Sequence, residues 1–263
     1  AIFFFQAHCG SEEVDLEGRS PVSCTSLHMT LRFPYLLLSS LVTAAAFLLD
    51  VGAPRTGTQS MFTALKLLGL NPLHTGYETH SRIPLCGYLF GNTSLDGALA
   101  TLKDFDGGMD EPTMLLYEEI MAAIPEAKFL LTISDPESWY DSYVRLVTAM
   151  RATHAPGLVL VPEDSFLYKC SAMRSWGCNF SSFSSEGKEE CLENYDKHNQ
   201  RVQEVIPPER LLVYNWSDGW APLSHFLGVP VPDKEFPHVD DILEHFEDLE
   251  MEMEEAESVQ SSD

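Results

Sequence analysis

Short apolar runs alternate along the chain with stretches whose apolar residues recur at helical spacing. The clearest runs are Ala46–Gly52, Ala127–Ile133 and Glu209–Trp216. Mainly apolar runs of this length are typical of strands buried inside a parallel sheet. Helical spacing follows the first two runs, at Thr58–Leu68 and from Pro136 onward. The pattern therefore predicts strands that are each followed by a helix.

Weaker patterns extend this alternation. Leu70–Glu78 and Asp104–Pro112 each predict a short strand, and helical spacing recurs at Thr113–Pro125 and from Cys191 to Pro207. Strands that alternate with helices imply a parallel sheet with helices on both faces. We therefore expect an α/β fold with three α/β/α layers around a central, mainly parallel sheet, similar to that of P-loop NTPases. Ligands of such sheets bind beyond the carboxyl ends of the strands.

The pattern also divides the chain into parts. We expect an extension at 1–45, a P-loop domain at 46–241 with an irregular insertion or lid at 157–190, and an acidic helix and tail at 242–263. The uncharged stretch Phe33–Leu49 has the composition of a signal-peptide core or a short membrane anchor. The sequence leaves the location open between the cytoplasm and the secretory pathway or Golgi membrane. Membrane association is expected only through that stretch.

Charge narrows the possible partners. The 263 residues carry a formal net charge of −24, which argues against nucleic acid or an anionic membrane as the main partner. An anionic ligand would need a local cationic pocket. The six cysteines include no CxxC pair, so we expect no metal site. A disulfide among Cys170, Cys178 and Cys191 is expected if the protein is secretory, and free thiols otherwise.

The segment VGAPRTGTQS, Val51–Ser60, joins the first predicted strand to the first predicted helix. Gly52 and Gly57 have the spacing of a phosphate-binding P-loop, but Thr58 stands where the P-loop lysine would be. Backbone amides and the helix N-terminus can still bind an anion. Arg55 supplies a cation, and neighbouring hydroxyls add donors. The loop therefore favours a terminal group with fewer charges than a nucleoside triphosphate and without Mg²⁺.

Several motifs, in this order, resemble the P-loop sulfotransferase-like family, whose donor is 3′-phosphoadenosine 5′-phosphosulfate (PAPS). They are GAPRTGT, PLHTGYE, SDPESWYDSY, PPERLLVYNW and DGWAPLSHFLGVPVP. One branch of that family is sometimes mislabelled as NAD-dependent epimerases. This chain lacks the G-x-G-x-x-G and Y-x-x-x-K motifs of an epimerase. The resemblance extends from about residue 47 to about residue 241.

The resemblance implies two groups of cofactor-binding residues. The first would hold the 5′-phosphosulfate and comprises Arg55, Thr56, Gly57, Thr58, Gln59 and Ser60. The second would hold the 3′-phosphate, and there Ser142 matches the serine of the family, with Ser138 one helical turn before it. Ser134 stands where the family has an arginine, so a charge-assisted contact becomes a neutral one. Arg145, Arg201 and Arg210 are the arginines that we consider as replacements.

Sulfuryl transfer needs a base for the acceptor and donors for the leaving phosphate. Arg55 and the loop supply the donors. For the base we consider His74, whose ordinary pKa suits the task, together with Asp110 and Glu111. Asp110 has the further possible roles of orienting His74 and capping a helix.

The sequence therefore predicts an enzyme that moves a sulfuryl group from PAPS to a hydroxyl or amine of a small molecule or glycan. Two alternatives remain. One is a P-loop kinase or NTPase, against which the missing lysine argues. The other is a non-catalytic binding protein with a sulfotransferase fold, which Ser134 favours.

Overall fold

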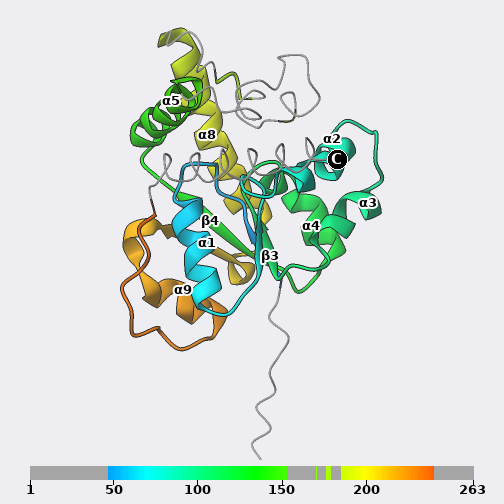
Figure 1. Ribbon diagram of the computed structural model, residues 1–263, viewed down its shortest axis with the longest axis vertical. Helices are drawn as coiled ribbons and strands as arrows, with labels where there is room; N and C mark the ends of the chain where they lie inside the picture. The colour runs from blue at the N-terminus through cyan, green and yellow to red at the C-terminus, as the bar shows by residue number, and fades with distance from the viewer. Residues whose placement is uncertain (1–46, 153–169, 171–175, 179–184, 240–263) are drawn as a thin grey trace, which may run out of the picture. The chain divides into compact units, whose positions relative to one another are not determined.

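Five parallel strands in the order β2-β3-β1-β4-β5 form the centre of the structure (Figure 1). The structure is a computed structural model that describes residues 47–152, 170, 176–178 and 185–239. The strands are β1 (Leu48–Asp50), β2 (Pro72–His74), β3 (Gly107–Met109), β4 (Lys128–Ile133) and β5 (Leu211–Asn215). Because all five run the same way, their carboxyl ends meet at one edge of the sheet.

Helices connect these strands. They are α1 (Thr58–Leu67), α2 (Arg82–Leu89), α3 (Leu95–Leu99), α4 (Tyr117–Ala123), α5 (Pro136–Ala152), α8 (Ser185–Val205) and α9 (Trp220–Leu227). Single 3₁₀ turns lie at Thr79–Ser81, Ala100–Leu102, Thr113–Leu116, Pro208–Arg210 and Trp216–Asp218. Among the described residues, no helix combines the length and the hydrophobicity that a membrane crossing requires.

The alternation of side chains along the strands gives the sheet two apolar faces. On one face Leu48 and Leu130 pack with Met61 and Leu65 of α1 and with Leu223 of α9. On the other face a second cluster joins the sheet to α2, α3, α4 and α8; its sheet members are Leu49, Val51, Leu73, Phe129 and Leu131. Helices thus cover both faces, and the predicted three-layer α/β fold is confirmed.

The predicted elements occur where the pattern placed them, with one exception. Asp135 caps α5, because its side chain accepts a hydrogen bond of 2.9 Å from the amide of Ser138. The exception is the stretch 157–190, predicted to be irregular: α8 already begins at Ser185. The spacing of apolar residues missed this first turn because Ser185–Glu190 is polar throughout. The rest of that stretch, apart from Cys170 and 176–178, lies outside the described residues, as do 1–45 and 242–263.

Four cysteines form two disulfides, Cys86–Cys170 and Cys178–Cys191. The first fastens Cys170 to α2, and the second fastens Cys178 to α8. The disulfide expected among Cys170, Cys178 and Cys191 for a secretory protein is present as Cys178–Cys191, whereas the sequence analysis did not anticipate Cys86–Cys170. Spacing alone did not reveal the first pair, because its cysteines are 84 residues apart in the sequence.

Replacing both Cys178 and Cys191 by Ala should destabilise the protein. Their sequence separation is 13 residues, and closing a loop of about that length stabilises a fold by roughly 3 kcal/mol. Denaturant unfolding of the variant and of the unmodified protein measures the difference, and a reductant should then change the unmodified protein more than the variant. Non-reduced peptide mapping that finds Cys178 unlinked to Cys191 would contradict the pairing.

Candidate functional site

The loop between β1 and α1 opens the first turn of α1 toward solvent. Two of its residues take the left-handed conformation, Arg55 with φ of 72° and Gly57 with φ of 98°. Gly57 is the N-cap of α1 and has no side chain to cap the helix, and the first turn has no acidic residue. The first amides of a helix have no partner within the helix. Together with the helix dipole, they form a site for an anion.

Side chains from α5 and α8 hold the backbone of this loop. The indole nitrogen of Trp139 donates a hydrogen bond of 2.8 Å to the carbonyl oxygen of Pro54. Nε2 of His198 donates one of 2.7 Å to the carbonyl oxygen of Val51. Burial lowers the pKa of His198, which favours the neutral ring. Both side chains therefore hold the backbone of the loop.

A buried hydrogen-bonded chain lies beneath the loop. Asp50, the last residue of β1, is 1% exposed, and its Oδ1 accepts a bond of 2.9 Å from the amide of Gly52. The hydroxyl of Thr132 lies 3.0 Å from Oδ1 and 3.2 Å from Oδ2 of Asp50. The Thr132 hydroxyl also lies 2.6 Å from the hydroxyl of Thr56. The Thr56 hydroxyl donates a hydrogen bond of 2.7 Å to the carbonyl oxygen of Ala53. This chain ties the turn Ala53–Thr56 to the middle of the sheet.

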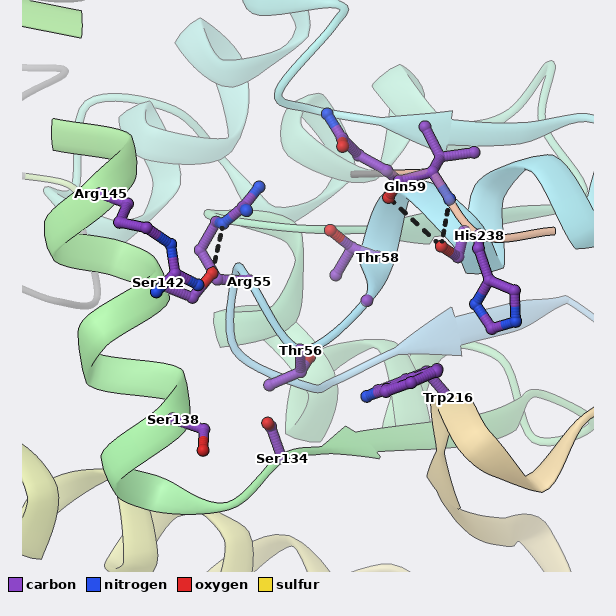
Figure 2. Close-up of a pocket in the computed structure, with 13 residues that line it drawn as sticks. Arg55, Thr56, Thr58, Gln59, Ser134, Ser138, Ser142, Arg145, Trp216 and His238 are labelled. Carbon is purple, nitrogen blue, oxygen red and sulfur yellow. Dashed lines mark hydrogen bonds between the residues drawn. The ribbon is translucent and has the colours of Figure 1, made fainter. Parts of the chain in front are cut away.

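A pocket of about 320 Å³ lies in front of the loop (Figure 2). Its lining residues are Arg55, Thr56, Gly57, Thr58, Gln59, Ser60, Ser134, Ser138, Ser142, Arg145, Trp216, His238 and Val239. This set contains two arginines and no Asp or Glu, in a chain whose net charge is −24. The pocket is therefore the local cationic site that an anionic ligand of this protein requires.

One face of α5 forms a wall of the pocket. Ser138, Ser142 and Arg145 lie on successive turns of this helix, and Figure 2 shows them on the side that faces the loop. Nε of Arg55 donates a hydrogen bond of 3.2 Å to the hydroxyl of Ser142. The two groups of residues that the sequence assigned to the two phosphates are thus in direct contact.

Ser134 follows β4 at the end of the pocket near Ser138. The hydroxyl of Tyr195 holds the backbone of Ser134. It accepts a hydrogen bond of 3.0 Å from the Ser134 amide and donates one of 3.1 Å to the Ser134 carbonyl oxygen. Of the three arginines considered as replacements for the missing cation, Arg145 alone is among the lining residues. Arg201 pairs with Glu118 at 3.3 Å. Arg210 donates to the carbonyl oxygens of Ala127 and Ile124.

The residues considered for the base are not among the pocket's lining residues. His74, 3% exposed, lies behind the loop with Nε2 3.3 Å from the hydroxyl of Thr58 and 3.6 Å from Oδ2 of Asp110. Its ring stacks on that of Tyr77 at 4.3 Å. Glu111 is also buried, and its carbonyl oxygen accepts from the hydroxyl of Thr75. The roles assigned to these residues stay predictions.

The contacts of His74 fix which nitrogen carries the proton. Nδ1 accepts a hydrogen bond of 3.2 Å from the amide of Gly76, so the neutral ring has its hydrogen on Nε2, facing Asp110 and Thr58. Burial raises the pKa of Asp110, while the amide of Glu111 and the charges of Arg82 and Arg55 lower it. A carboxyl group that titrates above its usual range, beside an imidazole, is suited to proton transfer.

Sequence reasoning missed three lining residues, Trp216, His238 and Val239. Trp216 directly follows β5 and is 47% exposed, and the ring of His238 lies edge-on to its indole at 5.2 Å. Its position directly after a strand could have identified it, because ligands of parallel sheets bind beyond the carboxyl ends of the strands. Val239 exchanges hydrogen bonds with Ser60, including one of 2.9 Å from its amide, and no local pattern indicates this long-range contact.

Comparisons with known proteins agree with this geometry. The family model described as sulfotransferase domain matches residues 48–245. A curated relative, "Ava biosynthesis cluster protein M" of Aspergillus versicolor, is 32% identical over 209 residues, which cover 73% of this chain and 79% of the relative. The matched region contains the sheet, the loop and every lining residue of the pocket. The chain belongs to the sulfotransferase-domain family.

Proposed function

We propose that this chain binds PAPS in the pocket and transfers its sulfuryl group to a hydroxyl or amine acceptor. The observation that carries the proposal is the N-terminus of α1 beside Arg55, in a pocket whose lining contains no Asp or Glu among the described residues. Such a site fits a phosphosulfate, whose charge is met by amides and a guanidinium without a metal ion. Among the described residues, no group of three metal-ligating side chains occurs.

The pocket offers a place for each part of the cofactor. The first amides of α1 and the side chain of Arg55 would hold the phosphosulfate end. The exposed indole of Trp216 offers a flat face for the adenine, because stacking on an aromatic ring suits any base. Ser138, Ser142 and Arg145 would hold the 3′-phosphate, with Arg145 as the cation that Ser134 does not supply.

When bound, PAPS supplies an activated sulfuryl group, and the chain supplies positioning, charge and a base. The amides and Arg55 would stabilise the negative charge that develops on the leaving phosphate. Nδ1 of His74 already accepts from Gly76, so neutral His74 has no free nitrogen for the proton of the acceptor. We therefore assign the base to Asp110, with His74 orienting it through Nε2 at 3.6 Å.

Two observations limit the acceptor and the location. The name of the Aspergillus versicolor relative assigns that protein to a biosynthesis cluster, which supports a small molecule over a glycan as the acceptor. The two disulfides support the secretory alternative, because disulfides persist mainly in oxidising compartments.

Adenosine 3′,5′-bisphosphate should raise the melting temperature of the purified chain, and ATP with Mg²⁺ should not. A ligand present at 100 times its Kd stabilises the native state by about 2.7 kcal/mol. Arg55→Ala should remove this shift because it removes the cation of the loop. Differential scanning fluorimetry measures all of these effects.

Arg201→Ala is the matched control, since Arg201 is in an exposed pair with Glu118 outside the pocket. It should keep the full shift. A shift with ATP and Mg²⁺ alone would instead support a kinase or NTPase. No shift with either ligand would support a non-catalytic binding protein.

Arg145→Ala should weaken adenosine 3′,5′-bisphosphate roughly 10- to 100-fold and leave adenosine 5′-monophosphate unchanged, because a hydrogen bond to a charged group contributes about 1.5–3 kcal/mol. Trp216→Ala should weaken both ligands, since both contain adenine. Calorimetric titration gives the four Kd values. Equal losses of both ligands in Arg145→Ala would place the 3′-phosphate elsewhere. Ser134→Arg should tighten the bisphosphate selectively, and an unchanged Kd would contradict a 3′-phosphate beside Ser134.

A further inference from the structure

The carboxyl group of Asp50 is buried in the centre of the sheet without a cationic partner among the described residues. Its hydrogen-bond partners are the amide of Gly52 and the amide and hydroxyl of Thr132. Thr132 packs so tightly here that a Cβ added to Gly52 would lie 2.0 Å from the Thr132 hydroxyl oxygen. An ionised carboxylate in such surroundings is expensive unless it is paired.

Counting hydrogens shows which form of Asp50 the geometry fits. The chain from Asp50 through Thr132 and Thr56 to the carbonyl oxygen of Ala53 contains three contacts, of 3.2, 2.6 and 2.7 Å. Two hydroxyl groups supply only two hydrogens. If Asp50 is ionised, one short oxygen–oxygen contact has no hydrogen and becomes repulsive. If Oδ2 of Asp50 carries a proton, each contact has its hydrogen.

The division of roles between the two carboxyl oxygens supports the protonated form. Oδ1 accepts from the amide of Gly52 at 2.9 Å and faces the amide of Thr132 at 3.4 Å, as a carbonyl oxygen would. The hydroxyl of Thr132 lies 3.0 Å from Oδ1 and 3.2 Å from Oδ2, and both amides face Oδ1, which leaves Oδ2 to carry the proton. In this state Asp50 donates to Thr132, Thr132 to Thr56, and Thr56 to Ala53.

We propose that Asp50 is a positioning residue that acts as a neutral carboxylic acid, and that its proton holds the Ala53–Thr56 turn in the shape that binds the anion. This inference rests on the proposed function, because it takes the loop as the binding site. Uptake of one proton from solvent converts the carboxylate into the acid and forms the missing link of the chain. Ionisation removes that link and places a negative charge beneath the site. Anion binding and protonation of Asp50 therefore favour each other.

The surrounding charges agree with this coupling. The pKa of Asp50 is raised to about 7, because burial and, to a smaller extent, the charge of Asp110 raise it by more than the hydrogen bonds from Gly52 and Thr132 lower it. Other titratable groups on neighbouring elements include Arg55 of the loop, His74 at the end of β2, Lys128 at the start of β4 and His198 of α8, whose ring bonds the carbonyl oxygen of Val51. Asp50 thus changes charge near neutral pH.

The test compares Asp50→Asn with the unmodified protein. The amide of Asn can accept from Gly52 and donate to Thr132, so it reproduces the protonated acid at every pH. We expect the two proteins to bind adenosine 3′,5′-bisphosphate equally at pH 5.5. At pH 8.5 the unmodified protein should bind about tenfold more weakly than the variant, which corresponds to one unit of pKa change on binding. The ratio of the two Kd values cancels the titration of the ligand itself.

Asp104→Asn is the matched control, because the Asp104 side chain is 80% exposed. The ratio of the Kd of Asp104→Asn to the Kd of the unmodified protein should stay near 1 at every pH. A ratio for Asp50→Asn that does not change with pH would overturn the positioning role. So would weaker binding by Asp50→Asn at pH 5.5.

Denaturant unfolding without ligand keeps this test separate from the proposed function. The pKa of Asp50 is raised on folding, from about 3.8 to about 7, so the native state binds more protons than the unfolded state between these values. The stability of the unmodified protein relative to Asp50→Asn should therefore fall as pH rises from about 4 to 7 and then level off. A difference that is constant over this range would show that Asp50 is ionised throughout and would refute the inference. If the predicted dependence appears but no ligand binds, the proposed function fails and the neutral acid stands.

Discussion

The structure depends on keeping the first turn of α1 without a cap. Folded proteins normally satisfy the first amides of a helix with the side chain of the N-cap residue. Here the N-cap is Gly57, which has no side chain. The loop must then be held from behind. Trp139, His198 and the chain that begins at Asp50 bind its carbonyl groups and its Thr56 hydroxyl from three directions. Arg55 keeps a left-handed backbone within this frame.

Charge is distributed so that the pocket contrasts with the rest of the molecule. The net charge of −24 would repel an anionic nucleotide at long range. Two arginines and the helix amides offset this repulsion inside the pocket. A buried carboxyl group directly under that pocket would oppose the same ligand if it were ionised. Its neutral form removes the conflict. The fold and the electrostatics of the site are thus linked through one proton.

Much of the fold followed from the sequence because each apolar run had one consistent explanation. Ala127–Ile133 is short and mainly apolar, which favours a buried strand over a surface helix. Pro136 follows Asp135, and the fixed backbone angle of proline suits the first position of a helix. The loop was predictable because strand, glycine spacing and helix occur in succession. Ser185–Glu190 was missed because polar residues give no periodicity, and the long-range Cys86–Cys170 pair leaves no local signal.

The site was only partly predictable, for a physical reason. The sequence can assign residues that follow strand ends, such as Ser134, to a common edge of the sheet. It cannot give the direction in which each side chain points. His74 ends β2 and still is not among the lining residues of the pocket. The selection of Arg145 over Arg201 and Arg210 also required knowing what the other two already bind. The importance of Asp50 appears only when the hydrogens of buried groups are counted.

The most direct test of the central claim is a crystal structure of the protein with adenosine 3′,5′-bisphosphate. The account predicts the 5′-phosphate on the amides of Thr58–Ser60 beside Arg55, the adenine against Trp216 and the 3′-phosphate near Arg145. A nucleotide bound elsewhere, with the first turn of α1 open to bulk solvent, would contradict it.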